Sequence, residues 1–456
     1  MLRPLLPFLT RVVVPCAVLC AAACAPPRAP ADDATPRVGA PDLAAGPSAA
    51  RPAFAPAWGM VAPARVLVHD FDPHRSEADN GAALRAAILA LRPGDRLEIG
   101  AGRYVIAARL GIRLAGTASH PIWIAARDGA RVVLTRPDPA QNALNVDFGR
   151  FLALQGLEIT GGDTGVKLYD CVEVWLDRCH VHHVGGVGIA ANSADTARLW
   201  LTRNEVHDTA GSGEGLYLGA ARGAFVTAFS VIAHNHVYRC SGMQGDGIEL
   251  KQGSYGNHIV GNVVHDTNYP CILLYGTGGR QPNVVERNVC YRSNDVVLQV
   301  QGEAIVFNNA LFGGTAGFTS HDHEGATRDL VFAHNTVLCP GRAVSLAAWG
   351  GRPGMAFLNN AIYSGSGDAV YFHNGSAGVL VRGNVALGTV RGTTAPFARG
   401  TGLADFVGAT FDGSALDVRP SAGSPLLGAA DPAFVPPDDL FGAPRTPPFD
   451  AGCRER

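Results

Sequence analysis

The sequence predicts an all-β protein in which 456 residues form a parallel β-helix (a solenoid) of about ten coils, with a short N-terminal capping helix. Three observations lead to this fold class. A short unit recurs at intervals of 21 to 31 residues, each unit carries alternating strands of about five residues, and 56 glycines lie mostly at turns. A single coil cannot bury its inner face, whereas stacked coils share one continuous core.

The recurring unit is an Asn followed two residues later by an apolar residue. Degenerate copies occur at Leu157 and Cys179. An Asn at a fixed turn position suits a left-handed corner, and its amide can bond to the same amide one coil away. A β-propeller also repeats, but its blades need about 40 residues and four strands each. The complete copies begin at Asn204, Asn235, Asn262, Asn288, Asn309, Asn335, Asn360 and Asn384.

The first 24 residues have the layout of a secretory signal peptide. Arg3 and Arg11 precede an apolar run at 12–19, and small residues lie before Cys24. Because the run is short for a membrane span, we expect an exported protein, either periplasmic, attached to the outer membrane or secreted. Residues 21–24 resemble a bacterial lipobox, which implies that Cys24 is lipidated and gives the only membrane attachment. Cleavage by ordinary signal peptidase is the alternative.

The remaining chain is expected to have three parts. Residues 25–64 are rich in Ala, Pro and Gly and too poor in large apolar groups to fold, so they are interpreted as a disordered linker. The β-helix is expected over 65–400, and a closing segment over 401–456. Apolar residues at helical spacing over 79–91 predict the capping helix, which Pro93 and the following Gly end.

Composition excludes some classes of function. The net charge of −2 leaves no basic surface, which argues against nucleic acid as a partner, and we expect a monomer. Seven cysteines follow Cys24, an odd number without a Cys-x-x-Cys pair, so a cysteine metal site is not expected. Cys290 falls on an inward position of its repeat and is predicted to be a buried free thiol.

Two motifs carry a family resemblance. Residues 93–104 (PGDRLEIGAGRY) and 116–126 (GTASHPIWIAA) resemble the start of secreted right-handed β-helix proteins of the pectate-lyase-like superfamily. Residues 421–430 (SAGSPLLGAA) are similar to the tail that closes many of them. The resemblance covers about 65–450 and implies a right-handed helix. It does not imply one activity, because the superfamily includes lyases, hydrolases, epimerases and non-enzymatic surface proteins.

One outward face is the predicted working surface. If Ile248 points inward, the outward positions of successive coils form two columns, with neighbours about 4.8 Å apart. Their mixture of aromatic and hydrogen-bonding groups suits sugar rings, and a solvated outer face is the alternative. The first column contains Lys167, Ala190, Tyr217, Glu249, Leu273, Gln299, Thr319, Ser345 and Tyr371, and the second contains Tyr169, Asn192, Gly219, Lys251, Tyr275, Gln301, His321, Ala347 and His373.

Glu249 and Lys251 are the principal catalytic candidates, with Tyr217 and Tyr275 on neighbouring coils. In β-elimination from a uronic acid, a base removes the proton α to the carboxyl while a cation or acid neutralises the carboxylate. Lys251 could be the base or the neutralising cation, and Glu249 could hold Ca²⁺ or polarise Lys251. A surface ion pair of little energetic value is the alternative.

Two more carboxylates precede equivalent strands. Asp246 is a further catalytic candidate and, with Glu249, a possible Ca²⁺ ligand, and Glu214 is expected to bind substrate. Two carboxylates on adjacent coils would also serve a glycosidase. The other expected substrate-binding residues are Tyr217, Tyr275, Gln299, Gln301 and His373.

Residues 245–262 (GDGIELKQGSYGNHIVGN) also resemble the region around the catalytic strand of β-helical alginate and chondroitin lyases. In that family a carboxylate pair binds Ca²⁺, a downstream Lys is the base and an Arg one coil later is the acid. Glu249 matches one Ca²⁺ ligand. Gly247 and Ser254 stand where the family has its second ligand and its Lys, and the loose candidates for the acid are Arg280 and Arg287.

Histidines form the other concentrated polar motifs. His321 is a catalytic candidate because His321-x-His323 on a strand would place two imidazoles on one side, as metal ligands or an acid–base pair need. A polar turn is the alternative. The repeated His-Asp pairs at 207–208 and 265–266, like the His pair at 182–183, are expected to be structural.

The sequence therefore predicts a polysaccharide-active protein that cleaves a uronic-acid-containing polymer by β-elimination. Glycoside hydrolysis on the same scaffold is one alternative, and a non-catalytic glycan-binding or structural surface protein is another. An enzyme requires Glu249, Lys251 and their neighbours to converge, whereas a rod leaves them on a flat face.

Overall fold

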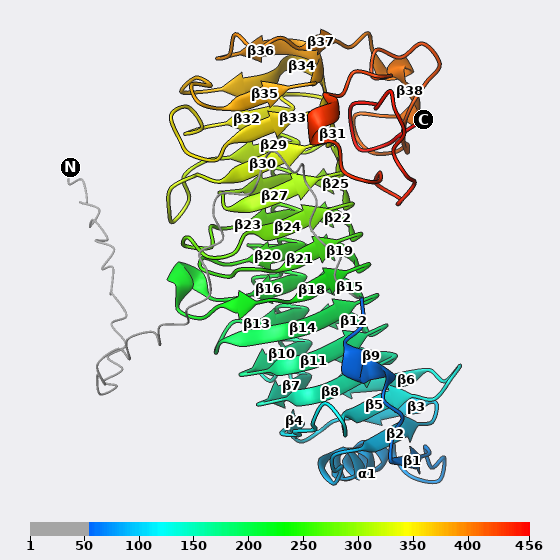
Figure 1. Ribbon diagram of the computed structural model, residues 1–456. Helices are drawn as coiled ribbons and strands as arrows, with labels where there is room; N and C mark the ends of the chain where they lie inside the picture. Colours follow the sequence, from blue (N-terminus) through cyan, green and yellow to red (C-terminus); the bar gives the residue numbers. More distant parts are fainter. Residues whose placement is uncertain (1–53) are drawn as a thin grey trace, which may run out of the picture. The chain divides into compact units, whose positions relative to one another are not determined.

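The computed structural model describes residues 54–456, which form a parallel β-helix. The predicted signal peptide, the lipidation site Cys24 and most of the predicted linker lie outside the described residues. Each full coil contributes three strands, one to each of three parallel ladders that run the length of the stack (Figure 1). Thirteen strands succeed one another in the first ladder, so the chain makes about twelve turns, close to the ten predicted.

The first ladder extends over the whole stack. A short additional strand, β17 (Thr227–Ala228), pairs with β14. The strands of the first ladder are β1 (Arg65–His69), β2 (Asp95–Ile99), β5 (Ile122–Ala126), β8 (Arg150–Gln155), β11 (Val172–Asp177), β14 (Thr196–Thr202), β18 (Val231–Ala233), β21 (His258–Val260), β24 (Asn283–Glu286), β27 (Ala304–Phe307), β30 (Leu330–Ala333), β33 (Ala356–Leu358) and β35 (Leu380–Arg382).

The second ladder follows the Asn corners. It consists of β3 (Gly102–Val105), β6 (Val132–Arg136), β9 (Leu157–Gly161), β12 (His180–Val184), β15 (Glu205–Thr209), β19 (His236–Cys240), β22 (Val263–Thr267), β25 (Val289–Ser293), β28 (Ala310–Phe312), β31 (Thr336–Cys339), β34 (Ala361–Phe372), β36 (Val385–Arg391) and β37 (Ala398–Arg399).

The third ladder carries the predicted working face and continues, after its own strands, through the second halves of β34 and β36. It consists of β4 (Gly111–Ile112), β7 (Leu144–Asp147), β10 (Val166–Tyr169), β13 (Ile189–Ala191), β16 (Leu216–Leu218), β20 (Ile248–Leu250), β23 (Ile272–Leu274), β26 (Leu298–Val300), β29 (Phe318–Ser320) and β32 (Val344–Leu346). In all three ladders the inward residues are mostly aliphatic or aromatic, with cysteines such as Cys240 and Cys290 among them, and they form one core along the axis.

The predicted ladder of Asn amides is present. The backbone N–H and the side-chain amide of Asn235 both donate to Oδ1 of Asn262, each over 2.9 Å, and the pattern continues from Asn204 to Asn384. The prediction that the Asn itself adopts the left-handed conformation was wrong. The residue before it does so, such as His234 with φ 55°, because the Asn turns inward to bond along the stack.

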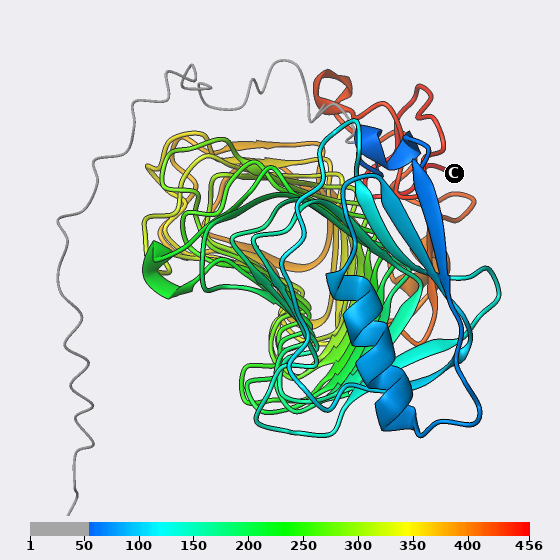
Figure 2. The ribbon, with the colours of Figure 1, turned by 90° about the horizontal axis from the view of Figure 1, so that it is seen from below.

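The capping helix is present as α1 (Glu77–Leu89), which lies across the first coil in the view along the stack (Figure 2). Its N-cap is Ser76, whose hydroxyl accepts a hydrogen bond from the backbone N–H of Asp79 over 3.1 Å. Leu84 and Ile88 join the core. A Cβ on Gly81 would lie 2.0 Å from the carbonyl oxygen of Val105, so only glycine allows the helix this close to β3.

Residues 54–64 are ordered, although the sequence placed them in the disordered linker. Trp58, in the 3₁₀ turn η2 (Ala57–Met60), is buried beside Trp175, and its indole N–H donates to Glu173 over 2.9 Å. Large aromatic side chains supply the buried area that the Ala- and Pro-rich composition of this segment lacks.

The C-terminal segment packs along the side of the last coils rather than across their end (Figure 1). It contains η4 (Leu403–Asp405), the hairpin β38 (Phe406–Ala409) and β39 (Leu416–Pro420), and η5 (Pro432–Phe434). The ring centroid of Phe406 lies 4.8 Å from that of Tyr363, and the N–H of Cys453 donates to the Thr336 hydroxyl over 3.0 Å. All seven described cysteines are buried and unpaired, which confirms the prediction for Cys290.

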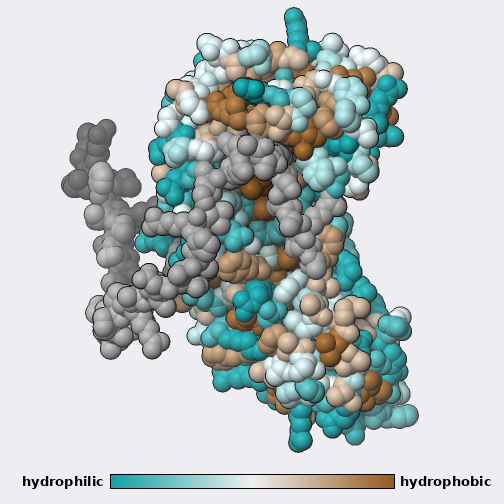
Figure 3. All heavy atoms as spheres, viewed as in Figure 1, coloured by the Kyte–Doolittle hydropathy of each residue, from teal (hydrophilic) through white to brown (hydrophobic). Residues whose placement is uncertain are grey.

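On the face seen in Figure 3, hydrophilic and hydrophobic residues are intermingled. Within residues 54–456, no helix has both the length and the apolar character that a membrane crossing requires.

Candidate active site

The third ladder places the predicted columns in register. Glu249 pairs with Tyr217 on one side and Leu273 on the other, and Leu273 pairs with Gln299. Ile248 lies between Leu216 and Ile272 in the core, so Glu249 points outward. The N–H groups of Lys251 and Tyr275 continue the ladder past the strand ends by donating to the carbonyls of the preceding coil, over 2.9 and 3.0 Å.

Three of the predicted residues, Glu249, Tyr217 and Tyr275, converge around the ammonium group of Lys251. It forms an ion pair with Oε1 of Glu249, and Nζ lies 5.0 Å from the ring centroids of both Tyr217 and Tyr275. The Lys251 side chain is 10 % exposed and that of Glu249 is 2 % exposed. The arrangement is therefore a recessed cation in an aromatic frame, not the exposed surface pair that was the alternative.

Burial and charge shift the pKa of both partners. Burial raises the pKa of Glu249 to about 7, against the opposing attraction of Lys251. Burial also disfavours the charged form of Lys251, but the charge and hydrogen bond of Glu249 outweigh it and raise the pKa of Lys251 above its ordinary value. Lys251 is consequently an ammonium ion at neutral pH, suited to neutralising an anion rather than to accepting a proton.

Glu214 and Asp246 lie behind this pair on adjacent coils. Their carbonyls occupy equivalent positions, accepting from the N–H groups of Gly188 and Gly215 over 3.0 and 2.8 Å. Both side chains are buried, and each leaves one carboxylate oxygen without a hydrogen-bond partner in the protein. Burial raises the pKa of Asp246 well above its ordinary value, with further contributions from Glu249 and Glu214.

A Ca²⁺ ion at Asp246 and Glu249 stays a prediction. Among residues 54–456, three groups bring at least three candidate ligand atoms within 4.8 Å of one another, and none of them contains Asp246 or Glu249. Glu249 already forms an ion pair with the ammonium group of Lys251. The residues thus offer no preformed set of the six to eight oxygens that Ca²⁺ takes, and no catalytic step is derived through it.

The loop after β29 folds back over the Lys251 site. Oε2 of Glu324 accepts a hydrogen bond over 3.3 Å from the N–H of Arg222, in the turn η3 (Ala221–Gly223). His323 lies with its ring centroid 4.6 Å from that of Tyr275, and its Nδ1 is 2.8 Å from the amide nitrogen of Gln299. Burial, His321 and Lys251 lower the pKa of His323, so its imidazole is neutral at neutral pH.

His323 was not among the predicted catalytic residues. The His321-x-His323 motif pointed to this loop, but counting along the column put it three coils away from Lys251. His321, the residue that was predicted, stacks on His323 at 5.5 Å and lies at the start of the loop, directly after β29. The repeat period predicts the position of strand β29, but it does not predict that the loop after β29 folds back over earlier coils.

The other predicted residues have different environments. Gln301 is buried, accepts from the N–H of Gly276 over 3.1 Å and thereby braces a turn. His373 stacks on Tyr371 at 3.9 Å, five coils beyond Lys251, or about 24 Å along the stack. It does not join the Lys251 site.

The side chains of the family-derived candidates have partners other than the Lys251 ammonium group. Ser254 is buried, and its hydroxyl accepts from the N–H of Thr227 over 3.1 Å at a corner. The guanidinium of Arg280 lies 4.9 Å from the Tyr255 ring centroid. Arg287 forms ion pairs with Glu286, at 3.4 Å, and Asp438.

Lysine usage is a sequence signal that was not exploited. Of the 37 basic residues only two, Lys167 and Lys251, are lysines, which leaves 35 arginines. Both lysines lie on the outward face of the third ladder. Arg and Lys differ in shape, hydration and acid–base behaviour, so lysine at these positions in an arginine-rich chain indicates a requirement for a compact ammonium group.

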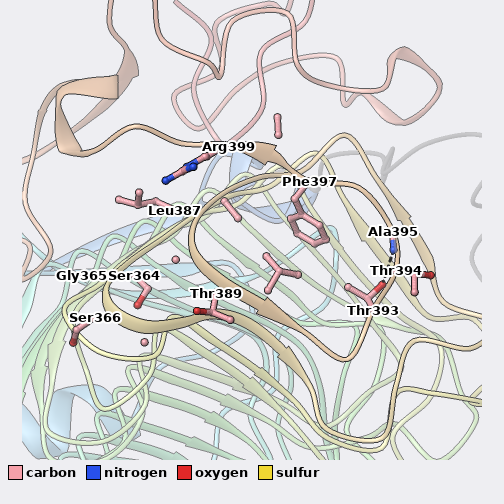
Figure 4. Close-up of a pocket in the computed structure, with 15 residues that line it drawn as sticks. Ser364, Gly365, Ser366, Leu387, Thr389, Thr393, Thr394, Ala395, Phe397 and Arg399 are labelled. Carbon is pink, nitrogen blue, oxygen red and sulfur yellow. Dashed lines mark hydrogen bonds between the residues drawn. The ribbon is translucent and has the colours of Figure 1, made fainter.

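A separate cavity of about 780 Å³ lies near the C-terminal end of the β-helix (Figure 4). Ser364, Thr389 and Phe397 are among its lining residues, and Arg399 is the only charged one. It can bind polar groups but offers no acid–base pair, so it is not a competing catalytic site.

Comparison with known proteins agrees with this architecture. Residues 138–289 match the family described as right handed beta helix region. No curated protein sequence matches the chain.

Several solved structures have a similar fold. The complex of XylC with xylose shares 10 % identity at a TM-score of 0.54, covering 86 % of this chain and 98 % of its own. The PL6 family alginate lyase AlyGC shares 15 % sequence identity at a TM-score of 0.53, and the match covers 85 % of this chain and 57 % of that chain. A PL6 alginate lyase complex with trisaccharide shares 13 % sequence identity at a TM-score of 0.50, and the match covers 83 % of this chain and 97 % of that chain. With the observed ladders, these findings identify the chain as a right-handed parallel β-helix protein.

Proposed function

We propose that the protein cleaves a uronic-acid-containing polysaccharide by β-elimination at the Lys251 site. The observation that carries this proposal is the Lys251 ammonium, kept charged by Glu249 and framed by two tyrosines under the loop that bears His323. The choice of polymer class also draws on two structural neighbours that are alginate lyases.

Each group has a role that follows from its charge state. Lys251 neutralises the substrate carboxylate, which makes the α proton more acidic. The neutral imidazole of His323 accepts that proton at Nδ1, whose lone pair otherwise accepts a hydrogen bond from the Gln299 amide N–H. The bond between C4 and the glycosidic oxygen then breaks, and a C4–C5 double bond forms.

Tyr217 supplies the proton for the leaving oxygen. Burial raises its pKa, so the phenol keeps its proton at neutral pH until the departing alkoxide removes it. The phenol is half-buried beside Lys251 and therefore remains accessible to a bound chain. Buried Glu249 acts through Lys251 as a positioning residue.

The test is ultraviolet absorbance of the unsaturated product during incubation with a panel of uronic-acid polymers, with and without Ca²⁺. We expect a rise with at least one polymer, lost in Lys251→Met and retained in Lys167→Met, which removes the other lysine of the same ladder. A rise that survives Lys251→Met would overturn the assignment.

Hydrolysis is the second candidate, because Glu249 has a pKa of about 7 and lies near two other carboxylates. New reducing ends without new absorbance would establish it. Neither signal on any polymer would favour the non-catalytic alternative.

We also propose export with lipidation at Cys24. Mass spectrometry of the mature N-terminus distinguishes a lipidated Cys24 from ordinary cleavage, and an uncleaved N-terminus in the cell fraction would contradict export.

A further inference from the structure

A histidine-rich surface lies on the second ladder, apart from the Lys251 site on the third. Strands β12 and β15 place His180 opposite Glu205 and His182 opposite His207. The column continues along the stack, where Glu205 pairs with His236. Of these outward residues, His182 and His207 were expected to be structural, but the spacing of the set brings metal-binding atoms together.

One such set is His180, Glu205 and His207. Nε2 of His180 lies 2.7 Å from Nε2 of His207, and Oε1 of Glu205 lies 4.0 Å from the latter nitrogen. One candidate ligand atom from each residue lies within 4.8 Å of the other two. Two imidazole nitrogens and one carboxylate oxygen are a ligand set typical of zinc-like ions.

Outer partners hold this set in an orientation suited to metal binding. Nδ1 of His207 is 2.7 Å from Oδ2 of Asp208, and Arg239 fixes that carboxylate with two hydrogen bonds of 2.6 Å. A proton held on Nδ1 leaves the Nε2 lone pair directed at His180. Oε1 of Glu205 accepts from the Tyr238 hydroxyl over 2.6 Å.

We propose that His180, Glu205 and His207 bind a divalent transition-metal ion of the zinc class. In the metal-free arrangement one Nε2 must donate its proton to the other. The ion takes the place of that proton. With metal–nitrogen bonds of about 2.0 to 2.1 Å in a tetrahedral site, the two nitrogens separate to about 3.3 Å, which requires only a small side-chain movement. Water completes the coordination.

The site can be reached from solvent. The Glu205 side chain is 44 % exposed. A depression of about 430 Å³ lies next to the site and is lined by His182 and His183, whose rings pack against that of His207.

The chain contains its own matched control. His236 and His265 repeat the pair, with Nε2 atoms 2.9 Å apart, Asp266 at 2.6 Å from Nδ1 of His265 and Arg292 on that carboxylate. This second pair is in no group of three candidate ligands within 4.8 Å among residues 54–456. Two imidazoles alone are expected to bind a metal ion far more weakly.

The test is calorimetric titration of the full chain with Zn²⁺ near neutral pH. We expect one ion per chain, at least about 100-fold weaker binding in His180→Ala/His207→Ala, and unchanged binding in His236→Ala/His265→Ala. Asp208→Asn should weaken binding about tenfold, as loss of an outer-shell partner does.

Two results would overturn the proposal: no saturable binding by the parent chain, or equal losses in the two double variants. If His180→Ala/His207→Ala does not fold, Glu205→Gln serves instead, because it keeps the volume and removes a charged ligand. Unchanged affinity in that variant would exclude Glu205 and with it the site.

Discussion

The two lysines occupy the same ladder and have opposite electrostatic environments. Lys251 is paired with the Glu249 carboxylate two residues away, whereas Lys167 bonds to the neutral amide oxygen of Asn192 on the next coil. Glu249 raises the pKa of Lys251, while burial lowers the pKa of Lys167 despite a weaker opposing effect of Asp163.

The repeat thus determines the position of each lysine side chain on the ladder, but one neighbouring residue determines the pKa of its ammonium group. Both ammonium groups lose hydration on the same kind of surface, and only that of Lys251 gains an ion pair with a carboxylate, whereas Asp163 acts on Lys167 more weakly. This difference makes Lys251 the candidate for neutralising a substrate carboxylate and makes Lys167 its natural control.

The largest expected effect is on stability. Glu249→Leu leaves the Lys251 ammonium buried without its anion, and we expect a loss of about 3 to 5 kcal/mol in the free energy of unfolding. Asn192→Leu removes only a hydrogen bond from Lys167, worth about 1 to 3 kcal/mol. Urea unfolding of both variants measures the difference.

The double variant Glu249→Leu/Lys251→Leu serves as the control. It should recover most of the loss, because apolar side chains replace both charges together. Equal destabilisation by Glu249→Leu and Asn192→Leu would show that the two lysines do not differ as described.

The columns could be predicted from sequence because strand alternation is strict and each coil adds one residue to each column. Leu216, Ile248 and Ile272 identify the inward side, and the outward residues follow from it. The same reasoning also placed Glu249 and Lys251 between Tyr217 and Tyr275.

Features that depend on loops and on isolated aromatic residues could not be predicted in this way. His323 reaches Tyr275 because an irregular loop crosses several coils, and no period encodes its path. Trp58 is ordered by contacts with Phe151, Trp175 and Glu173, inside a segment whose average composition argues for disorder.

A smaller expected effect concerns the shape of the cation. Lys251→Arg keeps the positive charge but places a wider planar group between Tyr217 and Tyr275, and a displacement of about 1 Å costs about 100-fold in rate. Lys167→Arg should leave the rate unchanged. Initial rates on the active polymer check both, and full activity in Lys251→Arg would contradict the need for a compact ammonium.

The pH dependence of stability gives a third test. The pKa of Glu249 is raised to about 7 in the folded protein, above its unfolded value, so the folded state binds more protons between these values. Stability from this group is full below about pH 4.3 and is lost as pH rises towards 7, by up to about 1.4 kcal/mol per pH unit.

Glu249→Gln should therefore flatten the fall in thermal midpoint between weakly acidic and neutral pH. Lys167→Met is the comparison variant. The lowered pKa of Lys167 in the parent protein affects stability only in the alkaline range. If the thermal midpoints of the parent protein and of Glu249→Gln changed in parallel with pH, the raised pKa of Glu249 would be ruled out.

The smallest expected effect is on amine reactivity at mildly alkaline pH. Only the uncharged amine reacts with acetic anhydride, so Lys167, with the lower pKa, should be acetylated at least about tenfold faster than Lys251. Peptide mass spectrometry separates the two sites. Exposure also differs between them, and Asn192→Asp removes that ambiguity, because it places a carboxylate beside Lys167 without changing the size of the side chain. Slower acetylation of Lys167 in this variant would show that the anion controls reactivity, and an unchanged rate would assign the contrast to access alone.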